Sequence, residues 1–216
     1  MQNLDKVILI TILANVLFSL AGFNKSEIFE KYKFNIASII NGEKLRMFTS
    51  GFLHADYAHL FFNMYTLYMF APIVVSRLGG TNFILIYLAS LLLGNVLSFY
   101  FHKNEPYYSA IGASGAVSGI LYSSILLYPD MSLYLFFIPI PIPSYVFGIG
   151  YLLYSIYGMK SQSDNIGHDA HFGGAVGGYI LTLLLVPSLL QTNILMVGLL
   201  AIPIVLLFFL TKTGKI

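Results

Sequence analysis

Long apolar segments dominate this chain of 216 residues. A helix that crosses a lipid bilayer needs about 20 mostly apolar residues, because it rises about 1.5 Å per residue through a core about 30 Å thick. Seven segments reach or approach that length: 7–23, 52–78, 83–101, 111–128, 144–158, 168–186 and 194–210. Only 9% of the residues are charged, against about 25% in an ordinary soluble domain. The sequence therefore predicts an all-α integral membrane protein.

We expect one domain over residues 1–216, a compact bundle of six transmembrane helices with its core at about 43–187, and an extra C-terminal helix at about 194–210. No small-residue cleavage site follows the first segment, so it is interpreted as a retained span and not a signal peptide. Charged residues mix with Ile, Phe and Tyr between the first two segments. This mixture favours short amphipathic helices on the membrane surface over a plain solvated loop. Alternating prolines at 139–143 forbid a regular helix there.

The composition argues against several classes of function. The net charge is only +2 and no basic run is present, so nucleic acid is not an expected partner. The chain has no cysteine, which removes disulfides, thiolate metal sites and cysteine nucleophiles. The expected surroundings are the lipid bilayer.

Small residues at 112–119 open the fourth apolar segment, and Ser114 lies among them. Small side chains let another helix approach closely. A serine hydroxyl becomes a nucleophile only when a base accepts its proton. His168 and His171, at the start of the sixth segment, are the candidate bases.

Both segments carry small residues where they would meet. Gly174 and Gly178 lie on the same helical face as His171, one and two turns further on. Gly112 and Gly115 flank the serine. The sequence therefore predicts that the serine and this histidine meet inside the membrane, although small residues in membrane helices more often serve only for packing.

Paired polar residues elsewhere offer further chemistry. His59 and Asn63 are four residues apart and face the same way on a helix. Both can donate hydrogen bonds to the oxyanion that acyl transfer creates, or they can form a purely structural pair. The histidine pairs His54 with His59 and His168 with His171 also leave open a metal site.

The motifs together resemble the rhomboid family of intramembrane serine proteases. Residues 112–115 match its Gly-x-Ser-Gly nucleophile motif, and residues 170–178 resemble its Ala-His-x-x-Gly-x-x-x-Gly motif. Residues 59–63 match its His-x-x-x-Asn motif, and His54 fits upstream. The resemblance covers roughly residues 43–178.

The resemblance implies an intramembrane serine endopeptidase in a compact bundle, with Ser114 as nucleophile and His171 as general base and acid. His59, Asn63 and the backbone amide of Ser114 would form the oxyanion hole, and His168 would have a supporting role. The substrates would be the transmembrane segments of single-span proteins, with no metal or cofactor. A catalytically inactive relative that binds transmembrane helices, or a histidine-based metal transporter or metalloenzyme, are the alternatives.

The charge distribution conflicts with the orientation that the resemblance implies. With seven alternating spans, Lys6 and Arg77 lie on the amino-terminal side, and the other 9 of the 11 lysines and arginines lie opposite. The positive-inside rule would then put the amino terminus outside. The family has a cytoplasmic amino terminus and an active site that opens to the outer face. We follow the family and expect a multi-pass protein of a prokaryotic cell membrane.

The sequence departs from the family in three places. Leu45-Arg46 stands where the family typically has a Trp-Arg pair, and many bacterial members lack a seventh helix. Ser118 stands one turn after the serine, where an aromatic ring often packs on the histidine. Another group is therefore expected to orient His171.

Overall fold

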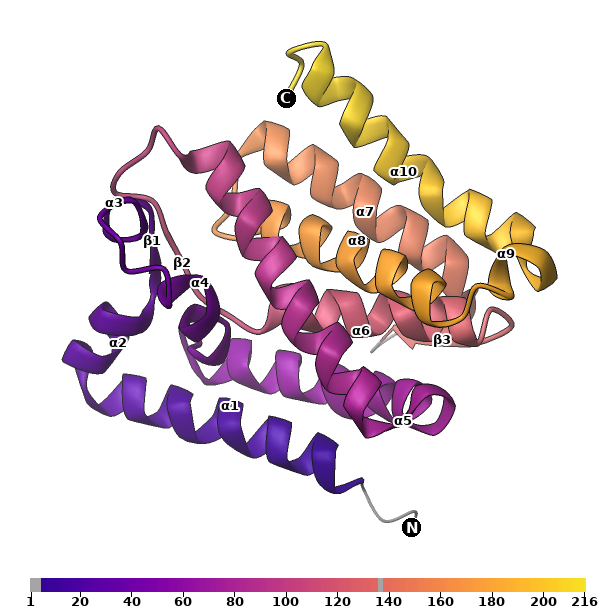
Figure 1. Ribbon diagram of the computed structural model, residues 1–216, viewed down its shortest axis with the longest axis horizontal. Helices are drawn as coiled ribbons and strands as arrows, with labels where there is room; N and C mark the ends of the chain where they lie inside the picture. The colour runs from indigo at the N-terminus through magenta and orange to yellow at the C-terminus, as the bar shows by residue number, and fades with distance from the viewer. Residues whose placement is uncertain (1–4, 136–137) are drawn as a thin grey trace.

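The computed structural model describes residues 5–135 and 138–216, and it is a helical bundle (Figure 1). The helix that covers one side is α1, and α10 covers the opposite side, with the remaining long helices between them (Figure 1). The described residues form six long helices: α1 (Lys6–Asn24), α5 (Tyr57–His102), α6 (Ser114–Leu127), α7 (Ser144–Ser161), α8 (His168–Leu185) and α10 (Ile194–Lys212). A short helix, α9 (Leu189–Thr192), leads into α10. The predicted helical membrane fold is confirmed.

Three of the described helices, α1, α5 and α10, are long and apolar enough to cross a membrane, and α6 is a shorter apolar helix. The second and third predicted segments both fall within the 46 residues of α5. The backbone breaks at Gly79, where φ is 81° and ψ is 164°, a conformation that glycine adopts without steric cost. The number of membrane crossings stays a prediction.

The centre of the bundle is α6, which packs against α5 and α8. All residues from Gly115 to Leu126 are buried. Glycines let the three helices approach at backbone distance, because a Cβ atom added to Gly174 would overlap the carbonyl oxygen of Gly115. Likewise, a Cβ atom on Gly178 would overlap the Gly119 carbonyl oxygen. The helix that begins at the candidate serine is therefore enclosed by protein along its length.

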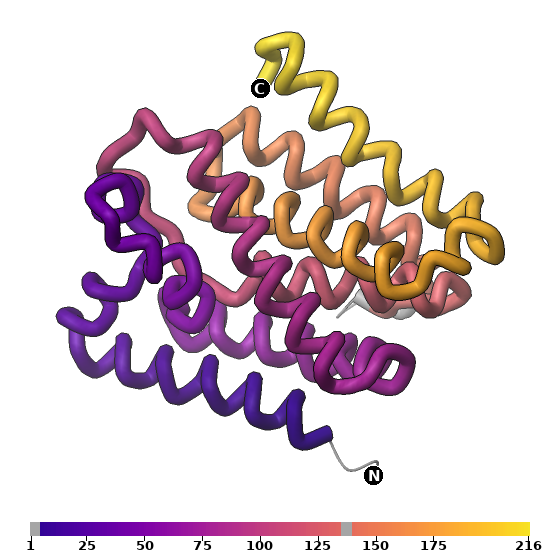
Figure 2. Tube along the Cα trace, viewed as in Figure 1, coloured from indigo at the N-terminus to yellow at the C-terminus, as the bar shows by residue number. Residues whose placement is uncertain are grey.

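The outer helices complete the bundle. On one side α1 packs along α5, and on the other side α7 packs against both α8 and α10. The Cα trace shows α7 and α10 running side by side (Figure 2). Gly148 of α7 allows this approach: its added Cβ atom would lie 3.1 Å from a methyl group of Leu200 on α10.

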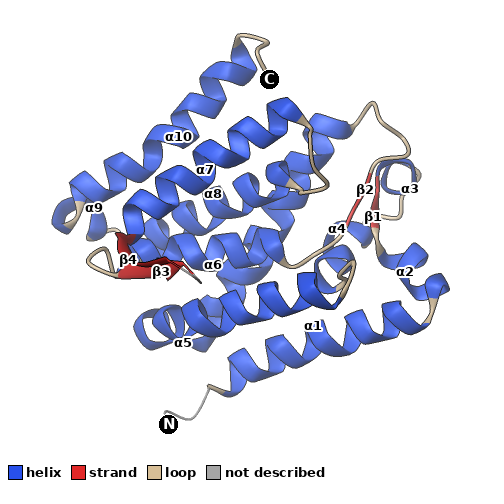
Figure 3. Ribbon diagram, turned by 180° about the vertical axis from the view of Figure 1, so that it is seen from behind, coloured by secondary structure: helices blue, strands red, loops and turns tan. Residues whose placement is uncertain are grey.

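The first loop folds into short helices, as its mixed pattern predicts: α2 (Ser26–Tyr32), α3 (Ile36–Ile40), α4 (Arg46–Thr49) and the 3-10 helix η1 (Ser50–Phe52). A short strand within it, β1 (Phe34–Asn35), pairs antiparallel with β2 (Ser109–Ala110) (Figure 3). This pairing ties the loop to the segment just before Ser114. Nothing in the sequence predicted it, because two-residue strands carry no periodic pattern.

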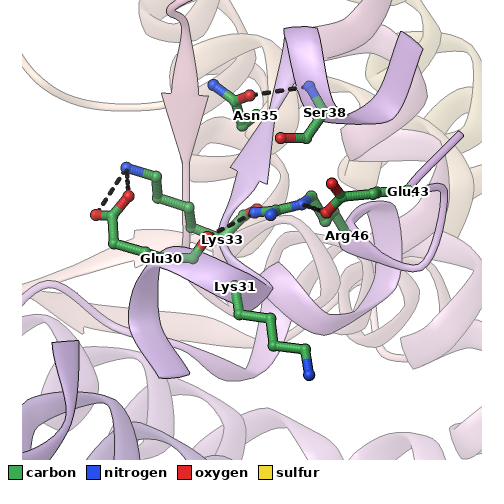
Figure 4. Close-up of a pocket in the computed structure, with 7 residues that line it drawn as sticks. All are labelled: Glu30, Lys31, Lys33, Asn35, Ser38, Glu43 and Arg46. Atoms are coloured by element: carbon green, nitrogen blue, oxygen red, sulfur yellow. Dashed lines mark hydrogen bonds and ion pairs between the residues drawn. The ribbon is translucent and has the colours of Figure 1, made fainter. Parts of the chain in front are cut away.

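Arg46 anchors the first loop (Figure 4). Its Nε donates a hydrogen bond to Glu43 at 2.6 Å, and one terminal nitrogen donates to the carbonyl oxygens of Glu30 and Lys33 at 2.6 and 3.0 Å. Only 12% of its side chain is exposed. The planar guanidinium can satisfy several acceptors at once, so Arg46 holds the end of α2 against the start of α4 without an aromatic neighbour at Leu45.

The described part of the proline-rich segment is extended strand and not helix. Strand β3 (Ser132–Leu135) pairs antiparallel with β4 (Ile138–Pro143), and α7 follows directly (Figure 3). The expected interruption of helix at 139–143 is confirmed. The all-α class holds, and the described residues add two small two-stranded sheets to it.

Candidate active site

A cavity of about 990 Å³ is bounded by α5, α6, α7, the start of α8 and the loops that precede α6 and α8. Ser114, His171, His59 and Asn63 all line it. Phe62, Leu121 and Phe147 are among its apolar lining, so polar and apolar groups face the same space. Residues from three predicted segments that are distant in the sequence therefore meet in one place.

The turn before α6 brings Ser114 next to His59. Gly112 has a φ of 123°, in the left-handed region that favours glycine. A Cβ atom added there would lie 2.8 Å from His59 Nε2 and 3.7 Å from Ser114 Oγ. The Gly112 amide donates to the carbonyl oxygen of Ser50 at 3.0 Å. Both the backbone angle and the space require glycine at this position.

The hydrogen bonds around His59 determine which of its ring nitrogens carries the proton. Asp56 caps the start of α5 by accepting a hydrogen bond from the His59 amide at 2.7 Å. The Ala55 amide donates to His59 Nδ1 at 3.4 Å. Since Nδ1 accepts, the neutral ring carries its proton on Nε2, the atom that lies beside Gly112. A hydrogen-bond donor therefore faces the cavity close to Ser114.

Asn63 lies one turn further along α5 and is buried. Its side-chain nitrogen donates to the His59 carbonyl oxygen at 3.1 Å, which fixes the amide on its own helix. An amide NH2 group has two hydrogens, so one further hydrogen bond can be donated.

His54 does not line the cavity, but it supports the turn that leads to Ser114. It is completely buried. Its Nε2 accepts a hydrogen bond from the Ala113 amide at 3.4 Å, and its Nδ1 lies 2.8 Å from Ser19 Oγ on α1. Because Nε2 accepts, the Nδ1 proton is available to Ser19, whose hydroxyl donates to the Phe52 carbonyl oxygen at 2.9 Å. His54 thus connects α1 to the chain just before Ser114.

The ring of His171 is stacked on Tyr151 of α7, with ring centroids 6.0 Å apart and an angle of 18° between the planes. The two candidate catalytic side chains share the cavity, and no hydrogen bond joins Ser114 to His171 among the residues that the structure describes. Such bonds are often long in a free enzyme and shorten when the reacting complex forms. The sequence did not indicate Tyr151, because one tyrosine of 16 in an aromatic-rich chain gives no signal.

His168 is buried between α7 and α8 and does not line the cavity. Its Nε2 lies 3.1 and 3.2 Å from the two carboxylate oxygens of Asp164. The backbone amide of Ile166, together with His168, lowers the pKa of Asp164. An added Cβ atom on Gly158 would overlap the His168 ring, so His168 packs tightly against α7.

Asp169 does not contact the candidate base. Its carboxylate lies 3.3 Å from His102 Nε2 at the end of α5, and the His102 ring stacks on Tyr108. Neither histidine pair gathers further ligands: among residues 5–135 and 138–216, no three His, Cys, Asp or Glu side chains converge as a metal ion would require.

Fold and cavity together define a multi-pass helical membrane protein with serine, histidine and asparagine side chains around one partly open cavity. The Rhomboid domain matches residues 41–188 of this sequence. The chain belongs to the rhomboid family, and the resemblance seen in its motifs is confirmed.

Relatives come from bacteria and from mitochondria. The Bacillus subtilis protein YdcA is 31% identical over 157 residues, which cover 68% of this chain and 70% of YdcA. Rhomboid protease GluP from the same organism is 36% identical over a stretch that covers 65% of this chain and 26% of GluP. RHOMBOID-like protein 12, mitochondrial, of Arabidopsis thaliana is 29% identical over a stretch that covers 71% of this chain and 50% of the Arabidopsis protein. This chain therefore spans half or less of the length of two of these relatives.

Proposed function

We propose that this chain is an intramembrane serine endopeptidase that hydrolyses peptide bonds in the transmembrane segments of other membrane proteins. The observation that carries the proposal is the shared cavity, which brings Ser114, His171, His59 and Asn63 together. Family membership and a relative named as a protease support the same reaction class.

In the first half of the reaction, His171 accepts the proton of the Ser114 hydroxyl while Oγ attacks the carbonyl carbon of the substrate. The carbonyl oxygen becomes an oxyanion. His59 Nε2–H, the second Asn63 N–H and the Ser114 amide would donate hydrogen bonds to it. His171 then gives its proton to the departing amine, and the acyl group stays on Ser114.

In the second half, a water molecule attacks the acyl group and His171 accepts a proton from it. The new bond forms between the water oxygen and the carbonyl carbon, and the bond to Oγ breaks. The proton returns to Ser114, and the carboxylate product leaves.

A substrate helix would reach the cavity between α5 and α7. Both helices line the cavity, through Phe62 on α5 and through Phe147 and Tyr151 on α7. The principal partners of α7 are α8 and α10, so an opening between α5 and α7 breaks little packing between those two helices. We propose α7 as the mobile gate. Unchanged cleavage after a cross-link between α5 and α7 would refute the gate.

We also propose that residues 1–216 form one rhomboid domain with α10 as an addition, in a cell membrane with the cavity open to its outer face. The first loop would then lie outside the cell. A topology reporter inserted after Lys33 tests this orientation, and a cytoplasmic signal would overturn it.

The decisive experiment is cleavage of a model single-span substrate in proteoliposomes by the unaltered protein, Ser114→Ala and His171→Ala. Cleavage by the unaltered protein alone, in the presence or absence of a chelator, is the expected result. Equal cleavage by all three proteins would refute the assigned nucleophile and base. Binding of the substrate helix without cleavage by any of them would favour an inactive helix-binding relative.

A further inference from the structure

We infer that Tyr151 is a positioning residue that orients the ring of His171, and that Ser118 holds Tyr151 in place. The inference rests on the proposed function, since it assigns the alignment of the proposed base. It concerns a contact between α7 and α8 that neither the motifs nor the family match identifies.

The first observation is the ring geometry. The planes of Tyr151 and His171 are within 18° of parallel, with centroids 6.0 Å apart. Offset stacking of this kind is favourable for aromatic rings at such separations. Phe147, one turn earlier on α7, stacks in turn on Tyr151 at 6.1 Å and 12°. The three rings form a layer on the cavity side of α7, with His171 at its end.

The second observation is a chain of hydrogen bonds from Tyr151 to Ser114. Ser118 Oγ donates to the Ser114 carbonyl oxygen at 2.7 Å, and it lies 2.7 Å from the Tyr151 hydroxyl. A serine hydroxyl has one hydrogen, and Ser118 uses it for the carbonyl. The Tyr151 hydroxyl is therefore the donor in the second bond. Ser118 is 3% exposed, so water competes little for these bonds.

These contacts connect the base to the nucleophile through a third helix. Tyr151 touches His171 through its ring and the helix of Ser114 through its hydroxyl. A small residue at 118 leaves the room that the tyrosine of α7 occupies. Because the orienting ring is on α7, His171 is aligned only when α7 is packed against α6 and α8. Displacement of α7 would withdraw the ring and loosen the base.

The test compares Tyr151→Phe, Ser118→Ala, their double variant and Tyr151→Leu in the full chain. Tyr157→Leu is the matched control, because Tyr157 is on the same helix with its side chain 64% exposed. Two rates are measured for each protein: cleavage of the single-span substrate, resolved into kcat and KM, and labelling of Ser114 by a small fluorophosphonate. Labelling requires an activated serine but no substrate helix, so it reports the base directly.

We expect Tyr151→Leu to lower kcat and the labelling rate by roughly 3- to 10-fold, the range that loss of an aromatic pair implies, with KM little changed. Tyr151→Phe keeps the ring and loses its hydrogen bond to Ser118, whereas Ser118→Ala loses that bond and also the one to the Ser114 carbonyl oxygen. Each should lower both rates roughly 2- to 5-fold. Their double variant should be no slower than Ser118→Ala alone, since Ser118→Ala already lacks the bond that Tyr151→Phe removes. Tyr157→Leu should behave as the unaltered protein.

A higher KM with unchanged labelling in the tyrosine variants would overturn the inference, because Tyr151 would then only line the substrate path. Additive effects of Tyr151→Phe and Ser118→Ala in the double variant would overturn the inference as well. Unaltered rates in each of these two variants would also overturn it. If Tyr151→Leu does not fold, the results for Tyr151→Phe and Ser118→Ala decide the question. Failure of the unaltered protein to be labelled at all would instead refute the proposed nucleophile.

Discussion

Gly174 of α8 lies directly against the carbonyl group of Gly115 on α6, and an added methyl group would overlap the carbonyl oxygen. The obstacle is backbone, which cannot rotate away as a side chain can. We expect Gly174→Ala to push α6 and α8 apart and to destabilise the protein by about 1–3 kcal/mol or more. Thermal unfolding of the purified protein in detergent measures the loss.

A matched control is Gly150→Ala on α7, where nothing lies within 4 Å of an added Cβ atom. Alanine is favoured over glycine inside a helix by about 0.5–1 kcal/mol, so this variant should be as stable as the unaltered protein or slightly more stable. Equal unfolding temperatures for the two variants would show that the α6–α8 contact can relax.

His54 should matter for the fold of the turn that carries Ser114, and for the chemical step only through that turn. Replacing it by Phe leaves the Ala113 amide without its acceptor and Ser19 without the ring nitrogen 2.8 Å away. An unsatisfied buried donor costs about 1–3 kcal/mol. We expect a corresponding loss of unfolding free energy and a lower labelling rate at Ser114. Stability equal to that of the unaltered protein would mean that the turn holds without His54.

We expect that even lysine cannot replace Arg46 in the first loop. In Arg46→Lys the charge remains, but one ammonium group cannot reach Glu43 and the carbonyl oxygens of Glu30 and Lys33 together. We expect faster proteolysis within residues 26–49, since hydrogen bonds to charged groups contribute about 1.5–3 kcal/mol each. Lys31→Ala, a neighbouring side chain in the same cleft (Figure 4), is the control and should digest at the original rate.

The loop between α7 and α8 should loosen in acid. The Ile166 amide and His168 lower the pKa of Asp164 in the folded protein. A depressed carboxyl pKa stabilises the fold above the unfolded value of about 4, and the contribution is lost as pH falls through the folded pKa. Hydrogen exchange at the Ile166 amide should be slower in the unaltered protein than in Asp164→Ala at neutral pH. The two should converge in acid, and a pH-independent difference would contradict the assignment.

Much of the fold follows from the sequence because its signals are local and repeated. The apolar segments at 7–23, 144–158, 168–186 and 194–210 correspond to α1, α7, α8 and α10 within a few residues. The break between the second and third segments occurs at Gly79, the first of two consecutive glycines that follow the second segment. Family motifs at fixed spacing likewise identified four residues that the structure brings into one cavity.

What the sequence could not indicate depends on contacts between distant segments. At position 118 the sequence showed only that a serine replaces the aromatic residue often found there in the family. The stacking of Tyr151 on His171 arises from how α7 packs on α8. The pairing of β1 with β2 joins residues more than 70 positions apart. His102 and Asp169 meet in the same way. Such pairs have no spacing rule, so they emerge only from the packed bundle.

The length of α6 has a consequence for how lipid affects this protein. Its 14 residues extend about 21 Å, well short of the roughly 30 Å hydrocarbon core. Enclosed by its neighbours, α6 needs no hydrophobic match to the bilayer. The apolar side chains exposed on α1 and α10 would contact lipid, so those outer helices are expected to tilt or shift when bilayer thickness changes. A thicker or thinner membrane should therefore change how easily substrates reach Ser114 and leave the depth of Ser114 within the protein unchanged.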